Sequence, residues 1–431
     1  MTGEDIVQLN RKYTLFSWSV QSAVKPIAFD RADGVYFWDT NGKQYLDFSS
    51  QLVNLNIGHQ HPKVVQAIQD QAALFCFAQP GFATEPRGLL GEKLIEVTPG
   101  NLVKAFFCLG GAEANENAIK IARMYTKRWK IMARYRSYHG ATHGAIALTG
   151  DPRRWAAEPT MPGVVRIFDP YCYRCIFGWT PDTCHRECVT HIEDVIRFEG
   201  PENIAAIFME GVTGTNGLIV PPDDYWPRVR QLCDKYGILL VSDEVMSGFG
   251  RTGKWFAVDH WDVVPDLITV AKGLTSGYVP LAAVVVSEPI AEYFDDKMLS
   301  CGLTYSSHPL ACAAGVATLE VYQEEGLIEN AARLGQVLGQ RLEEIKARHP
   351  SVGDVRYIGL FSAIELVKDR ATKEPLASAI LSQTLRDRGL STLLLGNLVT
   401  VSPPLCISET ELQAGLQIID ESLDIADQNL A

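Results

Sequence analysis

Short runs of apolar residues alternate with longer amphipathic segments between about residues 61 and 323. A run that is apolar throughout is typical of a strand buried on both faces of a parallel sheet, and its alternation with helices indicates βα units. The clearest predicted strands cover residues 104–109, 204–209, 238–242, 267–270 and 282–287. The pattern therefore predicts an α/β fold whose central domain contains a mostly parallel sheet.

Both ends of the chain have a different pattern. The expected elements after residue 324 are a long amphipathic helix over residues 327–348, strands near residues 360–366 and 398–401, and a last helix from about residue 409. Near the N-terminus, GVYFWDTNGKQYLDF predicts a hairpin that turns at Thr40-Asn41-Gly42. We expect residues 63–325 to form a large domain, and residues 1–62 and 326–431 to form together a smaller α/β domain. The cleft between two such domains is a favoured place for a small ligand.

Composition excludes several classes of protein. The 431 residues are 47% hydrophobic and 21% charged, which suits a globular protein of two or three domains. The net charge of −12 argues against a nucleic-acid partner, because such proteins need a basic face. The apolar runs are far shorter than the roughly 20 residues that span a bilayer, and the N-terminus has acids where a signal peptide needs bases. Ten cysteines are too few for a disulfide scaffold. We therefore expect a cytoplasmic protein with neither a nucleic-acid nor a membrane partner.

Three ionisable residues follow the best predicted strands. Glu210, Asp243 and Lys272 each come at the point where an apolar run ends. A single charged residue at a strand end is usually just the chain emerging into solvent. Because parallel strands end at the same edge of a sheet, where open α/β sheets bind ligands, three such residues together predict a site.

A pair of glycines, Gly110-Gly111, lies between a predicted strand and a helix. Such a junction lets the backbone approach a ligand, and the free N–H groups of a helix N-terminus favour an anion such as phosphate. The sequence has no GxGxxG fingerprint at this junction and no GxxxxGK[ST] motif. Dinucleotide binding and nucleoside triphosphate hydrolysis are therefore poorly supported, although a Gly-Gly turn is by itself more often plain packing.

Six segments carry a resemblance to a known family. LGGAEANENAIKIAR, SYHGATHGA, MEGVTGTNG, SDEVMSGFGRTG, TVAKGLTSGYVPLAA and GLTYSSHPLACAA occur in the order and spacing of the class III pyridoxal-phosphate aminotransferases. The resemblance extends from GVYFWDTNGKQYLDF to TVSPPL near the C-terminus. It implies fold type I, with a large cofactor-binding domain and a smaller domain built from both termini, and pyridoxal 5′-phosphate as the cofactor.

The resemblance also implies roles for the residues around the cofactor ring. Lys272 resembles the Schiff-base lysine, whose amine holds the cofactor and later moves a proton at the substrate carbon. Asp243 resembles the carboxylate that keeps the pyridine nitrogen protonated, so that the ring withdraws electrons. Val245 and Tyr138 match the side chains that pack against the two ring faces.

Further positions match the family around the rest of the cofactor. The matching residues are His139 behind Asp243, Glu210 near the cofactor's 3′-hydroxyl, Gly111 and Ala112 with backbone N–H groups for the phosphate, and Thr304 for the phosphate of the neighbouring subunit. The last match implies a homodimer with shared sites.

Departures from the family pattern bear on the substrate. Relatives that use 4-aminobutyrate have arginine where this chain has Ala141, and many relatives have arginine at the position of Thr400 with a glutamate partner at that of Thr215. Because a bidentate arginine is the usual partner of a carboxylate, these departures favour the branch that moves an amino group from an ω-amino acid, taurine or a primary amine to pyruvate. Trp18 and Tyr138 are expected as walls of the substrate pocket.

Other substrates and reactions stay open. One alternative is a 4-aminobutyrate or β-amino acid aminotransferase that uses 2-oxoglutarate. Another is an aminomutase or racemase on the same fold, and a third is a non-catalytic pyridoxal-binding regulator. Arg87 and Lys25 are candidates for binding the acid group of the substrate, but neither lies in a motif.

A cysteine cluster lies outside this pattern. Cys172, Cys175, Cys184 and Cys188 have the spacing C-x2-C-x8-C-x3-C, with His185 and His191 nearby. Four thiolates suit a tetrahedral zinc site. The first pair is flanked by aromatic residues, as though packed, so we predict a folded surface insert without a metal and leave zinc as the alternative.

Overall fold

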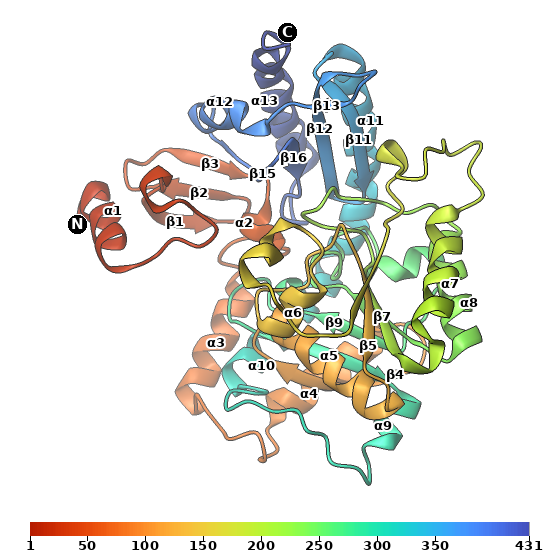
Figure 1. The fold of residues 1–431 in the computed structure, drawn as a ribbon. Helices are drawn as coiled ribbons and strands as arrows, with labels where there is room; N and C mark the ends of the chain where they lie inside the picture. Colours follow the sequence, from red (N-terminus) through yellow and green to blue (C-terminus); the bar gives the residue numbers. More distant parts are fainter. Residues whose placement is uncertain (431) are drawn as a thin grey trace.

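The centre of the molecule is a seven-stranded sheet, in a computed structural model that describes residues 1–430 (Figure 1). In spatial order its strands are β4 (Leu102–Cys108), β10 (Ala282–Ser287), β9 (Leu267–Val270), β8 (Leu239–Asp243), β7 (Ile204–Glu210), β5 (Lys130–Arg134) and β6 (Val164–Ile167). All neighbours are parallel except that β10 runs antiparallel to both β4 and β9. The predicted mostly parallel sheet is therefore confirmed, and so are its five predicted strands.

Helices cover both faces of this sheet, which is why its inner strands are apolar throughout. They are α3 (Pro62–Leu74), α4 (Glu85–Val97), α5 (Gly111–Thr126), α6 (His143–Leu148), α7 (Glu187–Glu199), α8 (Tyr225–Tyr236), α9 (Glu288–Tyr293) and α10 (Pro309–Glu324). One core joins a sheet face to α5 and α9, and a second core contains buried residues of α4, α8 and α10. Every residue of β7 is buried between these layers.

Two smaller sheets and the remaining helices are built from the ends of the chain. One sheet has β1 (Phe29–Asp33), β2 (Tyr36–Asp39), β3 (Gln44–Asp47) and β14 (Leu390–Ser391) in that order; the other has β11 (Val352–Ile358), β12 (Phe361–Asp369), β16 (Leu398–Val401) and β15 (Leu394–Leu395), with β13 (Glu374–Pro375) against β12. The other helices are α1 (Gly3–Tyr13), α2 (Ser50–Val53), α11 (Leu327–Arg348), α12 (Ser382–Asp387) and α13 (Glu409–Asp427).

The pairing of β14 with β3 joins the two ends of the chain. These strands are parallel, with Leu390 opposite Leu46, so the N-terminal and C-terminal segments share one sheet. The hairpin predicted at Thr40-Asn41-Gly42 is confirmed, with β2 antiparallel to β3 and Gly42 at a φ of 81°. Position 431, the last residue of the predicted segment 326–431, lies outside the described residues.

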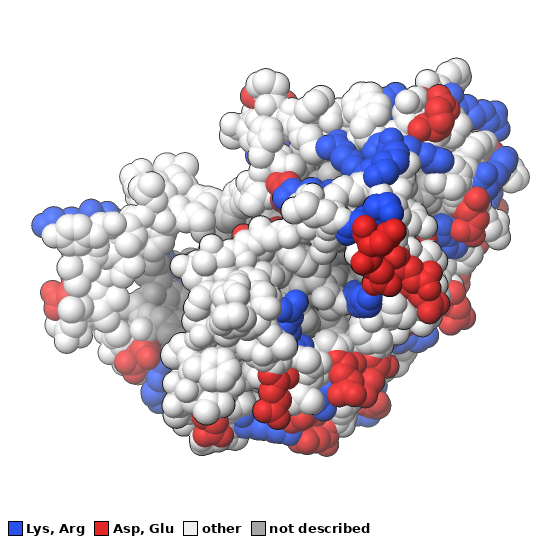
Figure 2. All heavy atoms as spheres, turned by 90° about the horizontal axis from the view of Figure 1, so that it is seen from below, with Lys and Arg blue, Asp and Glu red and all other residues white. Residues whose placement is uncertain are grey.

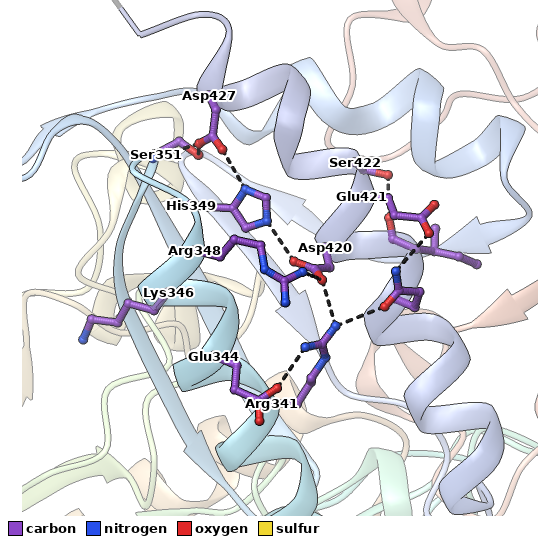
Figure 3. A network of polar contacts seen from close by, with 12 residues as sticks. Arg341, Glu344, Lys346, Arg348, His349, Ser351, Asp420, Glu421, Ser422 and Asp427 are labelled. Atoms are coloured by element: carbon purple, nitrogen blue, oxygen red, sulfur yellow. Dashed lines mark hydrogen bonds and ion pairs between the residues drawn. The ribbon is translucent and has the colours of Figure 1, made fainter.

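Helices α11 and α13 are tied together by a buried polar network (Figure 3). His349, directly after α11, lies between two acids of α13, with Nε2 2.8 Å from Asp420 Oδ1 and Nδ1 2.7 Å from Asp427 Oδ2. Arg341 Nη2 also donates to Asp420, at 2.7 Å. Both Asp420 and His349 are only 2% exposed, so water cannot take the place of a lost hydrogen-bond partner.

The molecular surface carries charges of both signs. Acidic and basic side chains lie side by side on the face seen in Figure 2. Within residues 1–430, no helix combines the length and the apolar character needed to cross a bilayer.

Candidate functional site

Glu210, Asp243 and Lys272 meet at the carboxyl edge of the central sheet, as their positions after apolar runs predict. Glu210 is the last residue of β7 and Asp243 the last of β8, and the two are register partners on neighbouring strands. Lys272 follows β9, the next strand of the sheet, by two residues. The parallel strand directions therefore bring two acids and one amine to the same place.

Asp243 is held rigidly by three hydrogen bonds. Its Oδ2 accepts from Asn115 Nδ2 and lies 2.8 Å from His139 Nδ1, and its Oδ1 accepts from the backbone N–H of Val245 at 3.1 Å. Thr269 in turn donates to the side-chain oxygen of Asn115 at 2.9 Å, which fixes the amide orientation. Asp243 is thus preorganised to face a cationic group. Asn115 received no role from the sequence, although it lies within the segment LGGAEANENAIKIAR.

Lys272 has an amine that is easily deprotonated. Its removal from water lowers the pKa to about 8, although the carboxylates of Asp243 and Glu210 act in the opposite direction. Its backbone has a φ of 40°, an unfavourable conformation for a residue with a Cβ, and such strain is typical of functional positions. A lysine in this state can act both as a nucleophile and as a base near neutral pH.

The N-terminus of α5 lies beside these residues. The helix begins at Gly111, and no side chain caps its first turn. A Cβ at Gly111 would come within 2.8 Å of Cγ1 of Val245, so the side chain at position 245 packs directly over this glycine. The uncapped backbone N–H groups of Gly111 and Ala112 can therefore receive an anion.

Glu210 connects the sheet edge to the segment that carries Tyr138. It accepts hydrogen bonds from the backbone N–H groups of Tyr138, at 3.0 Å, and Gly214, at 2.7 Å. Burial raises the pKa of Glu210, and the neighbouring charge of Asp243 acts in the same direction. The carboxyl therefore fixes two loops at the mouth of the site.

An arginine that the sequence did not single out completes this mouth. The guanidinium carbon of Arg153 lies 3.8 Å from the ring centre of Tyr138 and 5.5 Å from the ring of Trp18. The rings of Trp18 and Tyr138 are themselves in edge contact, with centres 6.0 Å apart. The predicted pocket walls are therefore neighbours, with a cation beside both of them.

The polar contacts of Arg153 leave part of its guanidinium free. Its Nε donates to Asp151 Oδ2 at 2.9 Å and its Nη2 donates to Thr215 Oγ1 at 2.7 Å, whereas its Nη1 has no hydrogen-bond partner among residues 1–430. The side chain is 29% exposed. Arg153 lies in the short 3₁₀ helix Pro152–Ala157, where no sequence motif marks it, and its place becomes visible only through its contacts with Tyr138 and Thr215.

Other predicted residues lie elsewhere in the single chain. Thr304 is exposed in a turn before α10. Arg87 donates to the carbonyl of Pro80, and the carbonyl of Lys25 accepts from Arg386. Thr400 is buried, and its hydroxyl donates to the carbonyl of Leu393. None of these contacts joins them to the groups around Lys272.

The groups at this edge match the chemistry of one cofactor. Pyridoxal phosphate has an aldehyde for an amine, a ring nitrogen for a carboxylate and a phosphate for a helix N-terminus. The structure provides all three in Lys272, Asp243 and the uncapped start of α5, with Val245 packed over Gly111. The fold and the site together define a pyridoxal-phosphate-dependent transferase of fold type I.

Comparison with known proteins identifies the family. The family model described as Aminotransferase class-III matches residues 18–423. The chain belongs to the class III aminotransferases, which depend on pyridoxal phosphate.

Three similar proteins differ in substrate. A structure of taurine:2-oxoglutarate aminotransferase from Bifidobacterium kashiwanohense, in complex with pyridoxal phosphate and glutamate, is 43% identical, covers 100% of this chain and 99% of its own, and superimposes with a TM-score of 0.95. The leucine/methionine racemase of Thermococcus litoralis is 39% identical over 98% of this chain and 96% of its own length. The taurine–pyruvate aminotransferase of Bilophila wadsworthia is 33% identical over 98% of each chain.

Proposed function

We propose that Lys272 holds the cofactor and moves the proton that defines transamination. When bound, pyridoxal phosphate supplies an aldehyde and an electron-withdrawing ring that stabilises negative charge on the substrate carbon. Lys272 is suited to take a proton from that carbon and to deliver it to the cofactor's C4′, two bonds away, because its pKa of about 8 lets it bind and release a proton near neutral pH.

The other residues around Lys272 have positioning roles in this proposal. Asp243, oriented by Asn115 and His139, faces the ring nitrogen, and Val245 and Tyr138 pack against the two ring faces. Gly111 and Ala112 donate backbone N–H groups to the phosphate, while Glu210 lies near the 3′-hydroxyl. These roles agree with the contacts around Asp243 and with the uncapped start of α5.

The substrate is an ω-amino acid, and Arg153 binds its acid group. The single observation that carries this proposal is the free Nη1 of Arg153, held at the mouth of the site by Tyr138 and Thr215. The charge of Arg153 also acts on Lys272 and lowers the pKa of its amine, so an acid group bound at this nitrogen lies near the reacting end of the site. Taurine and β-alanine are therefore the first donors to test, with Trp18 as a wall of the pocket.

The acceptor is a keto acid, and pyruvate is the first candidate. Position 400 has threonine where many relatives have arginine, so the chain lacks one cationic side chain that could pair with the second carboxylate of a dicarboxylic acceptor. The second candidate is 2-oxoglutarate, because Arg153 supplies a cation that the sequence pattern did not indicate and because the taurine:2-oxoglutarate enzyme is 43% identical.

A donor and acceptor screen tests the proposal. Taurine, β-alanine, 4-aminobutyrate and an aryl amine are each paired with pyruvate or 2-oxoglutarate, and the alanine or glutamate formed is measured by chromatography. Racemisation is assayed separately with L-leucine and no keto acid, because a racemase needs no second substrate. If the optical rotation of that sample changes and no donor pair gives product, the protein is a racemase and the proposed transamination is wrong.

Assembly and location complete the proposal. We expect a homodimer in which Thr304 reaches the phosphate of the neighbouring site, since it is exposed on the single chain. Residues 63–325 act as the cofactor-binding domain, and residues 1–62 with 326–431 form the small domain. All ten cysteines are unpaired, which favours a reducing cytoplasm. Light scattering measures the mass, and a monomer with full activity would contradict the shared site.

A further inference from the structure

The segment that runs from the end of β6 into the first turn of α7 contains four cysteines that line one small cavity. Cys172 and Cys175 flank a single helical turn, while Cys184 and Cys188 lie just before and within the first turn of α7. The cavity has a volume of about 20 Å³. A space of roughly 10–15 Å³ is enough for one water molecule, so this cavity has room for one small ion.

The second pair of cysteines is joined by a tight turn with an N–H···S hydrogen bond. The backbone N–H of Arg186 donates to Cys184 Sγ at 3.2 Å, and Arg186 has a φ of 65°, so the chain turns tightly around the sulfur. An N–H···S hydrogen bond and a nearby cation both stabilise a thiolate. Burial raises the pKa of Cys172 and raises that of Cys188 to about 12, and the charge of Arg186 offsets only part of this effect.

The ring nitrogens of His191 both have hydrogen-bond partners in the protein, so this histidine is not a candidate metal ligand. His191 Nε2 accepts from the backbone N–H of Phe168 at 3.0 Å, and its Nδ1 lies 2.8 Å from the carbonyl of Glu187. Both ring nitrogens are therefore used within the protein. All four cysteines are free thiols.

We propose that Cys172, Cys175, Cys184 and Cys188 bind one Zn²⁺. The sequence alone favoured an insert without a metal, and the shared cavity with its N–H···S contact reverses that preference. Four thiolates form a closed tetrahedral site with Zn–S distances of about 2.3 Å, and they release their protons as the ion binds. Within residues 1–430, no three of these sulfurs lie within 4.8 Å of one another, so binding draws them inward. Residues 178–183, which connect the two cysteine pairs, are exposed, so this segment can move as the sulfurs approach the ion.

A metal at these cysteines would stabilise the contacts between this segment and the sheet that contains β12. The two residues between Cys172 and Cys175 contact β12 and the turn that follows it, because Arg174 Nε donates to Glu365 Oε1 at 2.5 Å and the carbonyl of Tyr173 accepts from Lys373 at 2.7 Å. Glu365 also pairs with Arg356 at 2.8 Å, and Arg356 Nε donates to the carbonyl of Gly217. Gly217 belongs to the loop that contains Thr215. The zinc therefore supports the loop behind Arg153 without touching substrate.

Metal analysis of the full-length protein tests this proposal directly. Cells are grown with added zinc, the protein is purified without a chelator or a metal-affinity step, and its metals are measured by mass spectrometry. We expect about one zinc per chain. The double variant C175S/C184S should lose the zinc, whereas C76S, which removes an exposed cysteine outside the insert, should retain it.

A second measurement keeps the test valid if the double variant does not fold. Wild-type protein is titrated with a thiol reagent before and after treatment with a strong chelator, and released zinc is followed with a coloured indicator. Faster reaction of four thiols together with zinc release, and faster proteolysis between residues 176 and 183, are the expected results. A wild-type zinc content below roughly 0.2 per chain, or equal zinc in C175S/C184S and C76S, would overturn the proposal.

Discussion

Arg153 lies over the ring of Tyr138, with the guanidinium carbon 3.8 Å from the ring centre, and thereby places a cation at the mouth of a site formed by the central sheet. Stacking fixes the long side chain and reduces the entropy lost when a ligand binds. The remaining contacts, with Asp151 and Thr215, leave Nη1 without a hydrogen-bond partner among residues 1–430.

Replacing Arg153 by Gln should lower kcat/KM more for donors that carry an acid group than for donors that lack one. A hydrogen bond to a charged group contributes about 1.5–3 kcal/mol, so kcat/KM for taurine should fall roughly 10- to 100-fold. An aryl amine without an acid group should lose less than about threefold, because it makes no ion pair there. Steady-state kinetics with both donors provide the measurement, and an equal loss for both would remove the anchoring role.

Replacing Lys272 by Ala should abolish transamination while the fold persists. No other amine in the cluster of Asp243 and Glu210 can hold the cofactor or move the proton. Product formation and circular dichroism are measured together. Turnover in the folded variant above about one part in a thousand of wild type would be incompatible with the proposed role.

The pKa of about 8 for Lys272 predicts how the apoprotein captures its cofactor as pH changes. The neutral amine is the reactive form, so the rate should rise about tenfold per pH unit below pH 8 and level off above it. Stopped-flow absorbance of added pyridoxal phosphate between about pH 6 and pH 10 measures this rate. An inflection near the ordinary lysine value of about 10.4 would contradict the lowered pKa.

Replacing Asp243 by Asn should weaken catalysis far more than folding. The variant keeps the size of the side chain but removes the negative charge that we propose faces the ring nitrogen, so kcat should fall about a hundredfold or more. Asn115→Ala is the companion variant, because it keeps the charge but removes the 2.8 Å contact that orients it. A smaller loss is expected for that variant, and a larger one would mean that orientation matters more than charge.

Replacing His349 by Ala should destabilise the contact between α11 and α13. The change leaves Asp420 buried with fewer partners, and breaking such buried pairs costs about 3 kcal/mol. Arg388→Ala is the matched control, because Arg388 and its partner Glu421 are exposed and such pairs contribute less than about 1 kcal/mol. Urea unfolding compares the two variants, and equal losses would show that burial does not strengthen the network.

The sequence predicted the parts of the site that follow from local pattern. Glu210, Asp243 and Lys272 were predictable because each ends or follows an apolar strand, and parallel strands necessarily bring their carboxyl ends to one edge. The strands themselves were marked by burial, and the helix over residues 327–348 matches α11 because its apolar positions repeat at helical spacing.

Only the tertiary structure shows the position of Arg153 and the cavity that the four cysteines share. Arg153 is in a short 3₁₀ helix outside every sequence motif, and its partners Trp18 and Thr215 lie far away in the sequence. In the sequence, position 215 was notable only because it has threonine where related enzymes have glutamate. In the folded chain its hydroxyl accepts from a different arginine, because contacts between loops depend on how the domains pack and not on any periodicity in the residues themselves.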